Sequence, residues 1–231
     1  MISNLKITAH LLDGRIASSD GIILFDAIVY HAWFHKYAPE VLRGDYNTAW
    51  SNQFFGLPFA QDSDYRWYMA SKGLYVENDL HIEHYNKTPD FFAADKINKL
   101  NEKCQISDSV GIYRAYRNAV VIRTIENAKI YFFARGNKEK IVDLLSYIPA
   151  AGKKPSMGWG IVDKWEVEEI DGNYSVIHPD YGLMRPIPVD EADQYPNIDF
   201  SKYPVMRYGI KPPYWKPCNG RPCYVPIVRS K

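Results

Sequence analysis

The sequence has few cysteines and no long apolar run, and each absence excludes a class of protein. Three cysteines are an odd number and too few for a disulfide scaffold, which predicts a reduced protein. No apolar stretch approaches the roughly 20 residues that a membrane-spanning helix requires. Residues 1–6 lack the basic and apolar regions of a signal peptide. We therefore expect a globular, cytoplasmic protein that does not contact a membrane.

The sequence also lacks an excess of charge of either sign. Its 28 Lys and Arg residues are balanced by 27 Asp and Glu residues, which leaves a net charge of +1. A protein that binds nucleic acid by itself is usually more basic, so any RNA site must be a local patch, as in a subunit that shares its RNA with neighbours. Aromatic residues make up 15% of the chain and supply the contact area and stacking faces of extended interfaces.

The N-terminal part of the chain predicts a strand, a helix and an insertion. Residues 5–11 alternate apolar and polar side chains, as a half-buried strand does. Residues 24–38 repeat apolar side chains at helical spacing, and Pro39 ends that pattern. Residues 43–70 have no clear period and many aromatic side chains, which predicts an inserted loop.

The next two segments carry simpler patterns. Residues 74–85 alternate again, and Asn78 and Asp79 can form a turn, so this segment predicts a hairpin. Residues 90–103 place their apolar side chains on one face at helical spacing, which predicts an amphipathic helix.

The clearest unit is a strand, a helix, a glycine-rich loop and a second strand. Residues 128–134 are rich in β-forming side chains, and residues 138–148 carry an apolar helical stripe. The loop covers residues 150–160, and the second strand covers residues 161–167. This unit is half of a ferredoxin-like domain, and the first strand and helix supply the other half.

From residue 179 onward the chain is rich in proline and aromatic residues. Proline fixes φ and lacks an N–H donor, so we predict extended edges and loops there rather than central strands. The predicted fold class is α+β, with a ferredoxin-like (RRM-like) βαββαβ core. We expect one domain over residues 1–231, with an insertion at about 43–70 and an extension at about 179–231.

The glycine-rich loop has the chemistry of an anion site. Its glycines permit positive φ and let backbone N–H groups approach an anion, while its lysines and serine add donors for phosphate. It joins a helix to a strand, whereas the Walker A loop and the dinucleotide fingerprint run from strand to helix. The alternative is a tight connection with solvated lysines. The residues concerned are Gly152, Lys153, Lys154, Ser156, Gly158 and Gly160.

Residues 152–160, between a short helix and a strand, resemble the G-loop of the CRISPR repeat-associated RAMP superfamily. Residues 5–11, 130–133, 183–188 and 207–215 resemble segments of the RAMP subunit that binds the guide handle in type IV effector complexes. The resemblance implies a RAMP fold and binding of the repeat-derived 5′ handle of CRISPR RNA. It also implies packing against the backbone-forming and large subunits, and contact with target DNA only through the complex.

The resemblance transfers G-loop residues and nothing catalytic, and it implies no cofactor and no metal. Two further side chains occupy variable positions of the loop and are included as expected RNA contacts. The full set that the resemblance implies in the loop is Gly152, Lys153, Lys154, Ser156, Met157, Gly158, Trp159 and Gly160.

Basic and aromatic residues also interleave over residues 111–117. On a strand, Arg114 and Arg117 can clamp phosphate while neighbouring tyrosines stack on bases, and Arg123 follows after an apolar stretch. We predict that these three arginines contact RNA. The alternative is an edge strand whose arginines pair with surface carboxylates.

The aromatic strand before the loop has two faces. Tyr131 and Phe133 lie on one face, and Ile130 and Phe132 lie on the other. RNA-recognition modules stack bases on aromatic side chains of central strands. Because this sheet must bury both faces, we favour a packing role for these side chains.

Histidines raise the alternative of a nuclease. His31 and His35 are four residues apart and share a helix face, but the H-E-x-x-H pattern of zinc enzymes is missing. His81 and His84 fall on opposite faces of a strand. Cys218 and the nearby Cys223 are predicted to be free thiols rather than zinc ligands.

These observations favour a non-catalytic subunit that binds CRISPR RNA and caps its 5′ handle in a type IV effector complex. Two alternatives remain open. One is a metal-independent endoribonuclease that processes CRISPR RNA with a histidine as general base. The other is a protein-interaction module that does not contact RNA.

Overall fold

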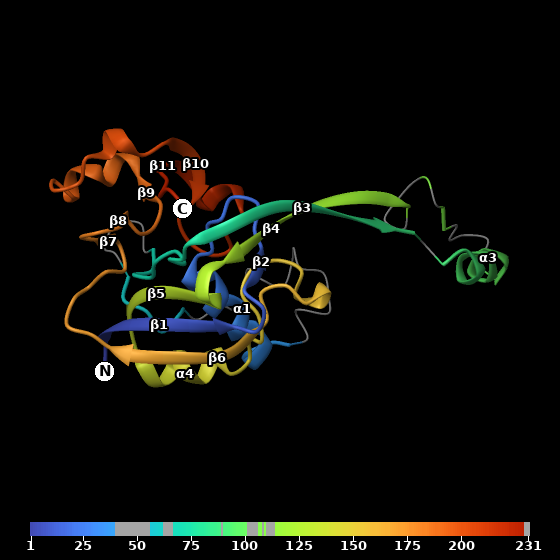
Figure 1. The fold of residues 1–231 in the computed structure, drawn as a ribbon, viewed down its shortest axis with the longest axis horizontal. Coiled ribbons are helices and arrows are strands. Elements are labelled where there is room, and N and C mark those ends of the chain that lie inside the picture. Colours follow the sequence, from blue (N-terminus) through green and yellow to red (C-terminus); the bar gives the residue numbers. More distant parts are fainter. Residues whose placement is uncertain are drawn as a thin grey trace.

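A three-stranded antiparallel sheet forms the centre of the body (Figure 1). In the computed structural model, β1 (Ser3–Leu11) lies between β5 (Lys129–Gly136) and β6 (Val162–Glu169). Its central position makes β1 the strand around which the body is organised. The structure describes residues 1–39, 56–61, 67–88, 90–100, 106–107, 109 and 114–228.

Two helices cover one face of this sheet. α1 (Phe25–Tyr37) and α4 (Lys138–Leu145) contact each other and share one apolar core with the strands. The alternation of β1 directs Leu5, Ile7 and Ala9 into this core, where each is fully buried. The strand and helix predicted for this part of the chain are therefore confirmed, with ends shifted by at most two residues.

The opposite face of the sheet is partly covered. Phe133 is only 7% exposed because the rings of Tyr174 and His178 lie 5.5 and 5.4 Å from its own, centroid to centroid. Tyr131 is half-buried, and the Lys6 ammonium lies 5.3 Å from its ring centroid. The packing role favoured from the sequence is therefore confirmed for Phe133.

A further segment continues the sheet beyond β5. Ala70 and Leu74 form isolated bridges with Ala134 and Tyr131 of β5. Trp67, just before them, is fully buried. Most of the insertion predicted over residues 43–70 lies outside the described residues, but this described end of it packs into the chain's own core.

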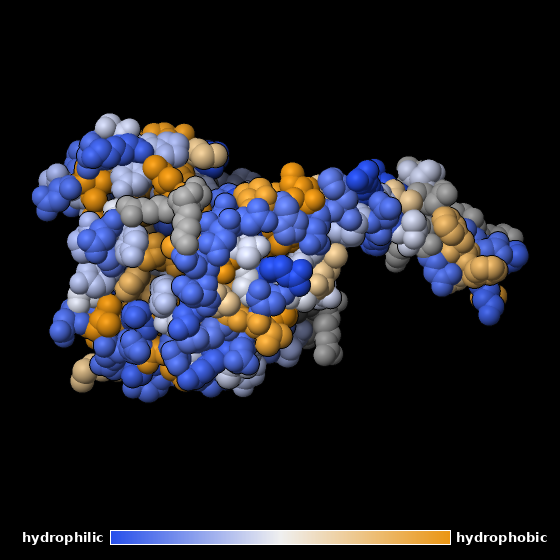
Figure 2. Space-filling model, in the orientation of Figure 1, coloured by the Kyte–Doolittle hydropathy of each residue, from blue (hydrophilic) through white to orange (hydrophobic). Residues whose placement is uncertain are grey.

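A long two-stranded arm projects from the body (Figure 1). β3 (Glu77–Lys87) pairs with β4 (Tyr116–Ile125), and the inner end of β4 also pairs with β2 (Arg15–Ala17). α3 (Phe91–Leu100) lies at the outer end of the arm, where none of its residues is buried. Figure 2 shows apolar and polar surface alternating along the arm and on α3. The helix predicted over residues 90–103 is confirmed for its described part.

The hairpin predicted over residues 74–85 is wrong. Asn78 and Asp79 belong to one continuous strand, and the pairing with β4 shifts register between Glu77 and Asp79. Alternation identified the strand correctly, but its partner β4 lies beyond α3 in the sequence. No local pattern reveals a partner at that separation.

The unit predicted around the glycine-rich loop is present. β5, α4 and β6 follow one another, and the loop joins α4 to β6. The Asn137 side chain caps α4 by accepting a hydrogen bond of 2.9 Å from the backbone N–H of Lys140. The helix ends at Leu145, three residues before the predicted end at residue 148.

The C-terminal extension forms two small sheets. β7 (Ile177–His178) pairs with β8 (Gly182–Leu183). β11 (Gly220–Tyr224) lies between β9 (Ile187–Pro188) and β10 (Val205–Gly209). None of the described helices is both long enough and apolar enough to cross a bilayer.

One proline departs from the prediction that prolines avoid central strands. Pro222 lies in β11, which has neighbours on both sides. The pairing with β9 begins only at Cys223, so Pro222 pairs on one side, with Arg207 of β10. Cys223 is a buried free thiol with a pKa that burial raises to about 11, and Cys218 is exposed.

A buried arginine fastens the extension to the body. The Arg185 guanidinium donates hydrogen bonds to the carbonyls of Tyr68, Ala70 and Ile210, the last two at 3.1 and 2.8 Å. It also lies 4.3 Å from the centroid of the Trp67 ring. Because Arg185 is fully buried, these contacts hold the residue that follows β10 against the segment that borders β5.

A buried carboxylate completes this attachment. Asp26 of α1 lies 3.9 Å from the Arg185 guanidinium and accepts hydrogen bonds of 2.6 Å from the Tyr214 hydroxyl. Burial raises the pKa of Asp26, and the nearby guanidinium and hydroxyl oppose that rise. The three side chains join α1 to the C-terminal extension.

Candidate nucleic-acid interface

The glycine-rich loop is built around positive φ angles. Gly152, Lys154, Gly158 and Gly160 have φ values of 96°, 58°, 89° and 70°. A Cβ at Gly160 would lie 1.8 Å from the Ala151 carbonyl oxygen, so the packing of the loop itself requires glycine there. A Cβ at Gly158 would meet no atom within 4 Å, which leaves that side of the loop open.

Some of the loop's backbone N–H groups are already bonded within the chain. Those of Lys153 and Gly160 donate to carbonyls of β2, at 2.9 and 2.7 Å. The N–H groups of Lys154 and Ser156 have no acceptor in the described part of the chain. Main-chain binding of an anion is therefore limited to the loop N–H groups without an internal acceptor, which include those of Lys154 and Ser156.

Lys153 lies against the turn that follows β2. Its ammonium donates a hydrogen bond of 3.1 Å to the Ser19 hydroxyl and forms no ion pair with any described residue. This leaves its positive charge uncompensated and at the surface, because the residue is exposed. The turn thus fixes the direction of the lysine without neutralising it.

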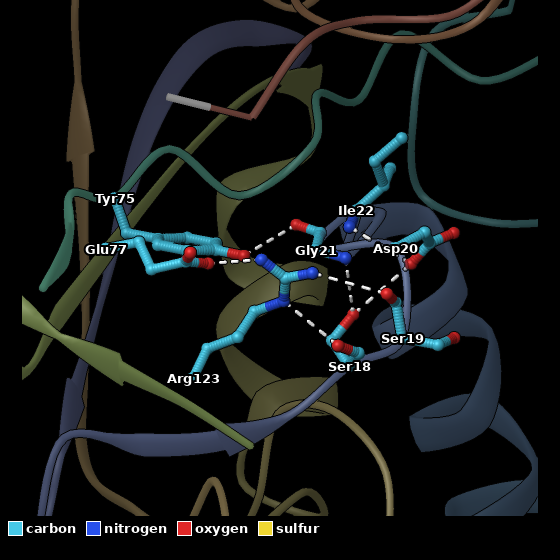
Figure 3. Close-up of polar contacts among 8 residues, drawn as sticks. All are labelled: Ser18, Ser19, Asp20, Gly21, Ile22, Tyr75, Glu77 and Arg123. Atoms are coloured by element: carbon cyan, nitrogen blue, oxygen red, sulfur yellow. Dashed lines mark hydrogen bonds and ion pairs between the residues drawn. The ribbon is translucent and has the colours of Figure 1, made fainter. Parts of the chain in front are cut away.

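Arg123 holds this turn in place (Figure 3). Its Nε and Nη2 atoms donate to the carbonyls of Ser18 and Ser19 at 3.0 and 3.2 Å, and Nη1 forms an ion pair with Glu77. The residue is only 8% exposed. The prediction that Arg123 contacts RNA is therefore not supported, because its guanidinium donates to groups inside the chain. It positions the turn that receives Lys153.

Hydrogen bonds between residues close in sequence stabilise the same turn (Figure 3). The Ser18 hydroxyl accepts from the N–H of Gly21 at 3.1 Å, and the Asp20 carboxylate accepts from the N–H of Ile22 at 3.2 Å. The Tyr75 hydroxyl donates to the Gly21 carbonyl at 2.7 Å. Local and long-range contacts together make this turn a fixed support for the loop.

Trp159 also leaves the set of predicted RNA contacts. It is 3% exposed and packs with Ala17, Ile122 and Val120, where the loop meets β2 and β4. A buried indole has no free face on which a base could stack. Trp159 anchors the loop to the base of the arm.

Lys154 reaches the arm. Its ammonium lies 5.5 Å from the ring centroid of Tyr85, and the Tyr85 hydroxyl accepts a hydrogen bond of 2.8 Å from the Asn118 amide. Interaction with the lysine lowers the pKa of Tyr85, and the same interaction raises the pKa of Lys154. Lys154 forms no ion pair with a carboxylate of the described residues.

A second cation and tyrosine lie further out on the same face of the arm. Lys87 pairs with Tyr116 across the two strands, and its ammonium lies 5.7 Å from the tyrosine ring centroid. Lys87 is two residues from Tyr85 on β3, and alternate strand residues share a face. The loop and the arm therefore form one surface of cations and aromatic rings.

Three residues of this surface were not predicted from the sequence, namely Tyr85, Lys87 and Asn118. The available signal was the alternation of aromatic and polar side chains at positions 85 and 87 of one strand and 116 and 118 of the other. That signal becomes informative only once β3 and β4 are known to pair.

The remaining predicted residues are exposed but are not all together. Ser156 and Met157 lie on the loop, and Met157 is 41% exposed. Arg117 pairs with Asn86, so it lies on the opposite face of the arm from Tyr85. Arg114 is exposed just before β4. The structure thus groups the loop with Tyr85 rather than with the two arginines.

A family model described as CRISPR type IV associated protein Csf3 matches residues 3–226. The chain belongs to this family. It is therefore a type IV CRISPR-associated subunit, and membership assigns it to a multi-subunit complex. None of the curated proteins compared with the chain matches it.

Proposed function

We propose that this Csf3 family member binds the 5′ handle of CRISPR RNA as a non-catalytic subunit of the type IV effector complex. One observation carries the proposal. Lys153 and Lys154 place two ammonium groups on the glycine-rich loop, and neither forms an ion pair within the described residues. Uncompensated cations beside free backbone N–H groups attract phosphate oxygens.

The arm adds the second requirement of single-stranded RNA binding. Tyr85 and Tyr116 offer ring faces next to cations, and unpaired bases stack on such rings whatever their sequence. The loop would hold the phosphates of the handle, and the arm would hold its splayed bases. Target DNA would be read by pairing with the guide and not by this chain.

We also propose a ferredoxin-like core of the RAMP type. The chain runs through β1, α1, the segment with Ala70 and Leu74, β5, α4 and β6. Across the sheet the order is β6, β1, β5 and then that segment. A βαββαβ unit with its second strand at one edge has this succession. The arm would then be an insertion before the third strand.

The proposed partners follow from this assignment. They are CRISPR RNA, the backbone-forming subunit and the large subunit of the complex. The exposed α3 and the C-terminal extension are surfaces outside the loop region that are available for such packing.

The test removes both ammonium groups inside the assembled complex. Lys153→Ala/Lys154→Ala is coexpressed with the other subunits, and RNA that copurifies is quantified and sequenced. We expect retained RNA to fall by about tenfold, because two phosphate contacts are lost.

The matched control is Lys202→Ala/Lys216→Ala, which removes the same charge from the C-terminal extension. Lys202 already pairs with Asp199 at 3.2 Å, so little RNA should be lost. If the loop variant retains as much RNA as this control, RNA binding by the loop is refuted and the protein-interaction alternative gains support.

A metal-independent endoribonuclease is the second candidate function. The structure places His31, His35 and Lys153 around one cavity, and the two imidazole rings lie 4.6 Å apart. His31 is exposed, and partial desolvation of its ring and the neighbouring His35 lower its pKa, which favours the neutral form that a general base requires. Purified protein incubated with repeat RNA tests this candidate. Cleavage that disappears in His31→Ala and His35→Ala would refute the non-catalytic proposal in favour of the nuclease. Intact RNA would support the non-catalytic proposal.

A further inference from the structure

A cavity of about 610 Å³ lies beside the glycine-rich loop. α1 forms one wall, and the chain from Ile148 to Lys153 forms another. The turn after β2 and the tyrosines Tyr208 and Tyr214 complete the lining. Its volume lies within the range of pockets that enclose small organic groups.

The walls of this cavity are mainly apolar. Ile22, Leu24, Ala27 and Ile28 contribute side chains from the turn and α1, and Ile148 contributes from the opposite side. Apolar walls favour a ligand with apolar faces, because contact between the two removes apolar surface from water. A flat aromatic group meets that requirement.

The polar groups at the cavity are few, and some are already occupied. The Asp20 carboxylate accepts a hydrogen bond of 3.1 Å from the Tyr208 hydroxyl. His31 and His35 make no hydrogen bond with the rest of the described chain, and their rings meet edge to face. The Lys153 ammonium completes the set. The available chemistry is therefore two imidazoles and one cation.

We propose that this cavity receives one unstacked base of the RNA whose phosphate lies on Lys153. The inference rests on the proposed function and adds a base-binding subsite to it. The apolar walls would cover the faces of the base, an imidazole would contact its edge, and the ammonium would hold the adjoining phosphate. A neutral apolar side chain from another subunit is the competing occupant. The cation at the rim favours a nucleotide instead.

The test combines removal of single bases with filling of the cavity. Short RNAs with the sequence of the 5′ end of the copurified RNA, each with one abasic ribose at a different position, are bound to the purified full-length chain. We expect one position at which loss of the base weakens binding by about tenfold, as loss of one base contact does. In Ala27→Phe, which places a ring in the cavity, that penalty should disappear.

Two further variants keep the result interpretable. Ala150→Phe fills the cavity from the opposite wall, in case Ala27→Phe does not fold. Ala119→Phe adds the same ring at an exposed position of β4 and should leave the abasic penalty unchanged. Thermal melts check that each variant is folded.

The outcomes separate this inference from the proposed function. A penalty at one position that both filled variants abolish supports the base subsite. If Lys153→Ala/Lys154→Ala weakens binding but no abasic position is sensitive to filling, the subsite is refuted and RNA binding by the loop survives. If neither the lysines nor the bases matter, both ideas are refuted.

Discussion

The buried attachment at Arg185 and the exposed glycine-rich loop use positive charge in opposite ways. Arg185 is fully buried, donates to backbone carbonyls and lies close to Asp26. Lys153 and Lys154 are exposed and have no carboxylate partner among the described residues. A buried cation that donates to carbonyls and lies beside a carboxylate acts within the fold, whereas an exposed cation without a counter-ion is available to a ligand.

Arg123 shows that position near a site does not decide between these two roles. It lies close to Lys153 through the turn at Ser18 and Ser19, yet its guanidinium is fully engaged. It therefore belongs with Arg185 as a structural cation. The contacts of a side chain, rather than its residue type or neighbourhood, separate the two classes.

The largest effect should come from the buried attachment. Arg185→Met removes the guanidinium, which leaves Asp26 without its counter-ion and several carbonyls without a donor, so we expect a loss of about 3–5 kcal/mol in the free energy of unfolding. Urea denaturation measures this loss. RNA affinity of the folded fraction should not change. A loss below about 1 kcal/mol would show that the attachment does not depend on this cation.

Two glycines of the loop should differ although both have positive φ. Gly160→Ala forces a Cβ against the Ala151 carbonyl and should cost about 2–3 kcal/mol in unfolding free energy. Gly158→Ala meets open space and should cost only the backbone strain, about 1 kcal/mol. Denaturation of both variants checks the order, and equal losses would contradict the loop geometry.

A pair of arginines separates structural from ligand-available cations within β4. Arg123→Ala breaks the ion pair with Glu77 and the hydrogen bonds to the turn, so unfolding free energy should fall by about 1.5–3 kcal/mol. Arg117→Ala removes an exposed side chain and should change stability by less than about 0.5 kcal/mol. Thermal denaturation compares them. A larger loss for Arg117→Ala would reverse the assignment.

The smallest effect concerns a surface carboxylate on the sheet. Contacts with Lys164 and then His10 lower the pKa of Glu166 to about 2. Because this value lies below that of the unfolded chain, the favourable contribution is complete above the ordinary glutamate range and is lost as pH falls toward 2. Carbon NMR of the Glu166 carboxyl should follow that titration. Lys164→Ala should move the pKa upward, and an unchanged value would contradict the contact.

Local patterns predicted the parts of the fold that depend on neighbours in sequence. β1, α1 and the unit from β5 to β6 follow from alternation, helical spacing and the cap at Asn137. The glycine-rich loop was identified as a candidate site for the same reason. Its glycines and lysines lie together in the chain.

Features that depend on distant partners were missed or misassigned. The pairing of β3 with β4 spans α3, so the sequence predicted a hairpin where one long strand exists. Trp159 is buried only because the loop packs against β2 and β4. The Arg123 guanidinium is not free to bind RNA, in part because it forms an ion pair with Glu77. The contact between Lys154 and Tyr85 likewise joins the loop to the arm. Only the tertiary fold could reveal these relations.

The most direct test is a structure of the assembled type IV complex with its RNA. We predict RNA phosphates within hydrogen-bonding distance, about 2.7–3.2 Å, of the Lys153 and Lys154 ammonium groups. We also predict a base near Tyr85. A loop that faces solvent or another protein, with no nucleotide nearby, would refute RNA binding by the loop.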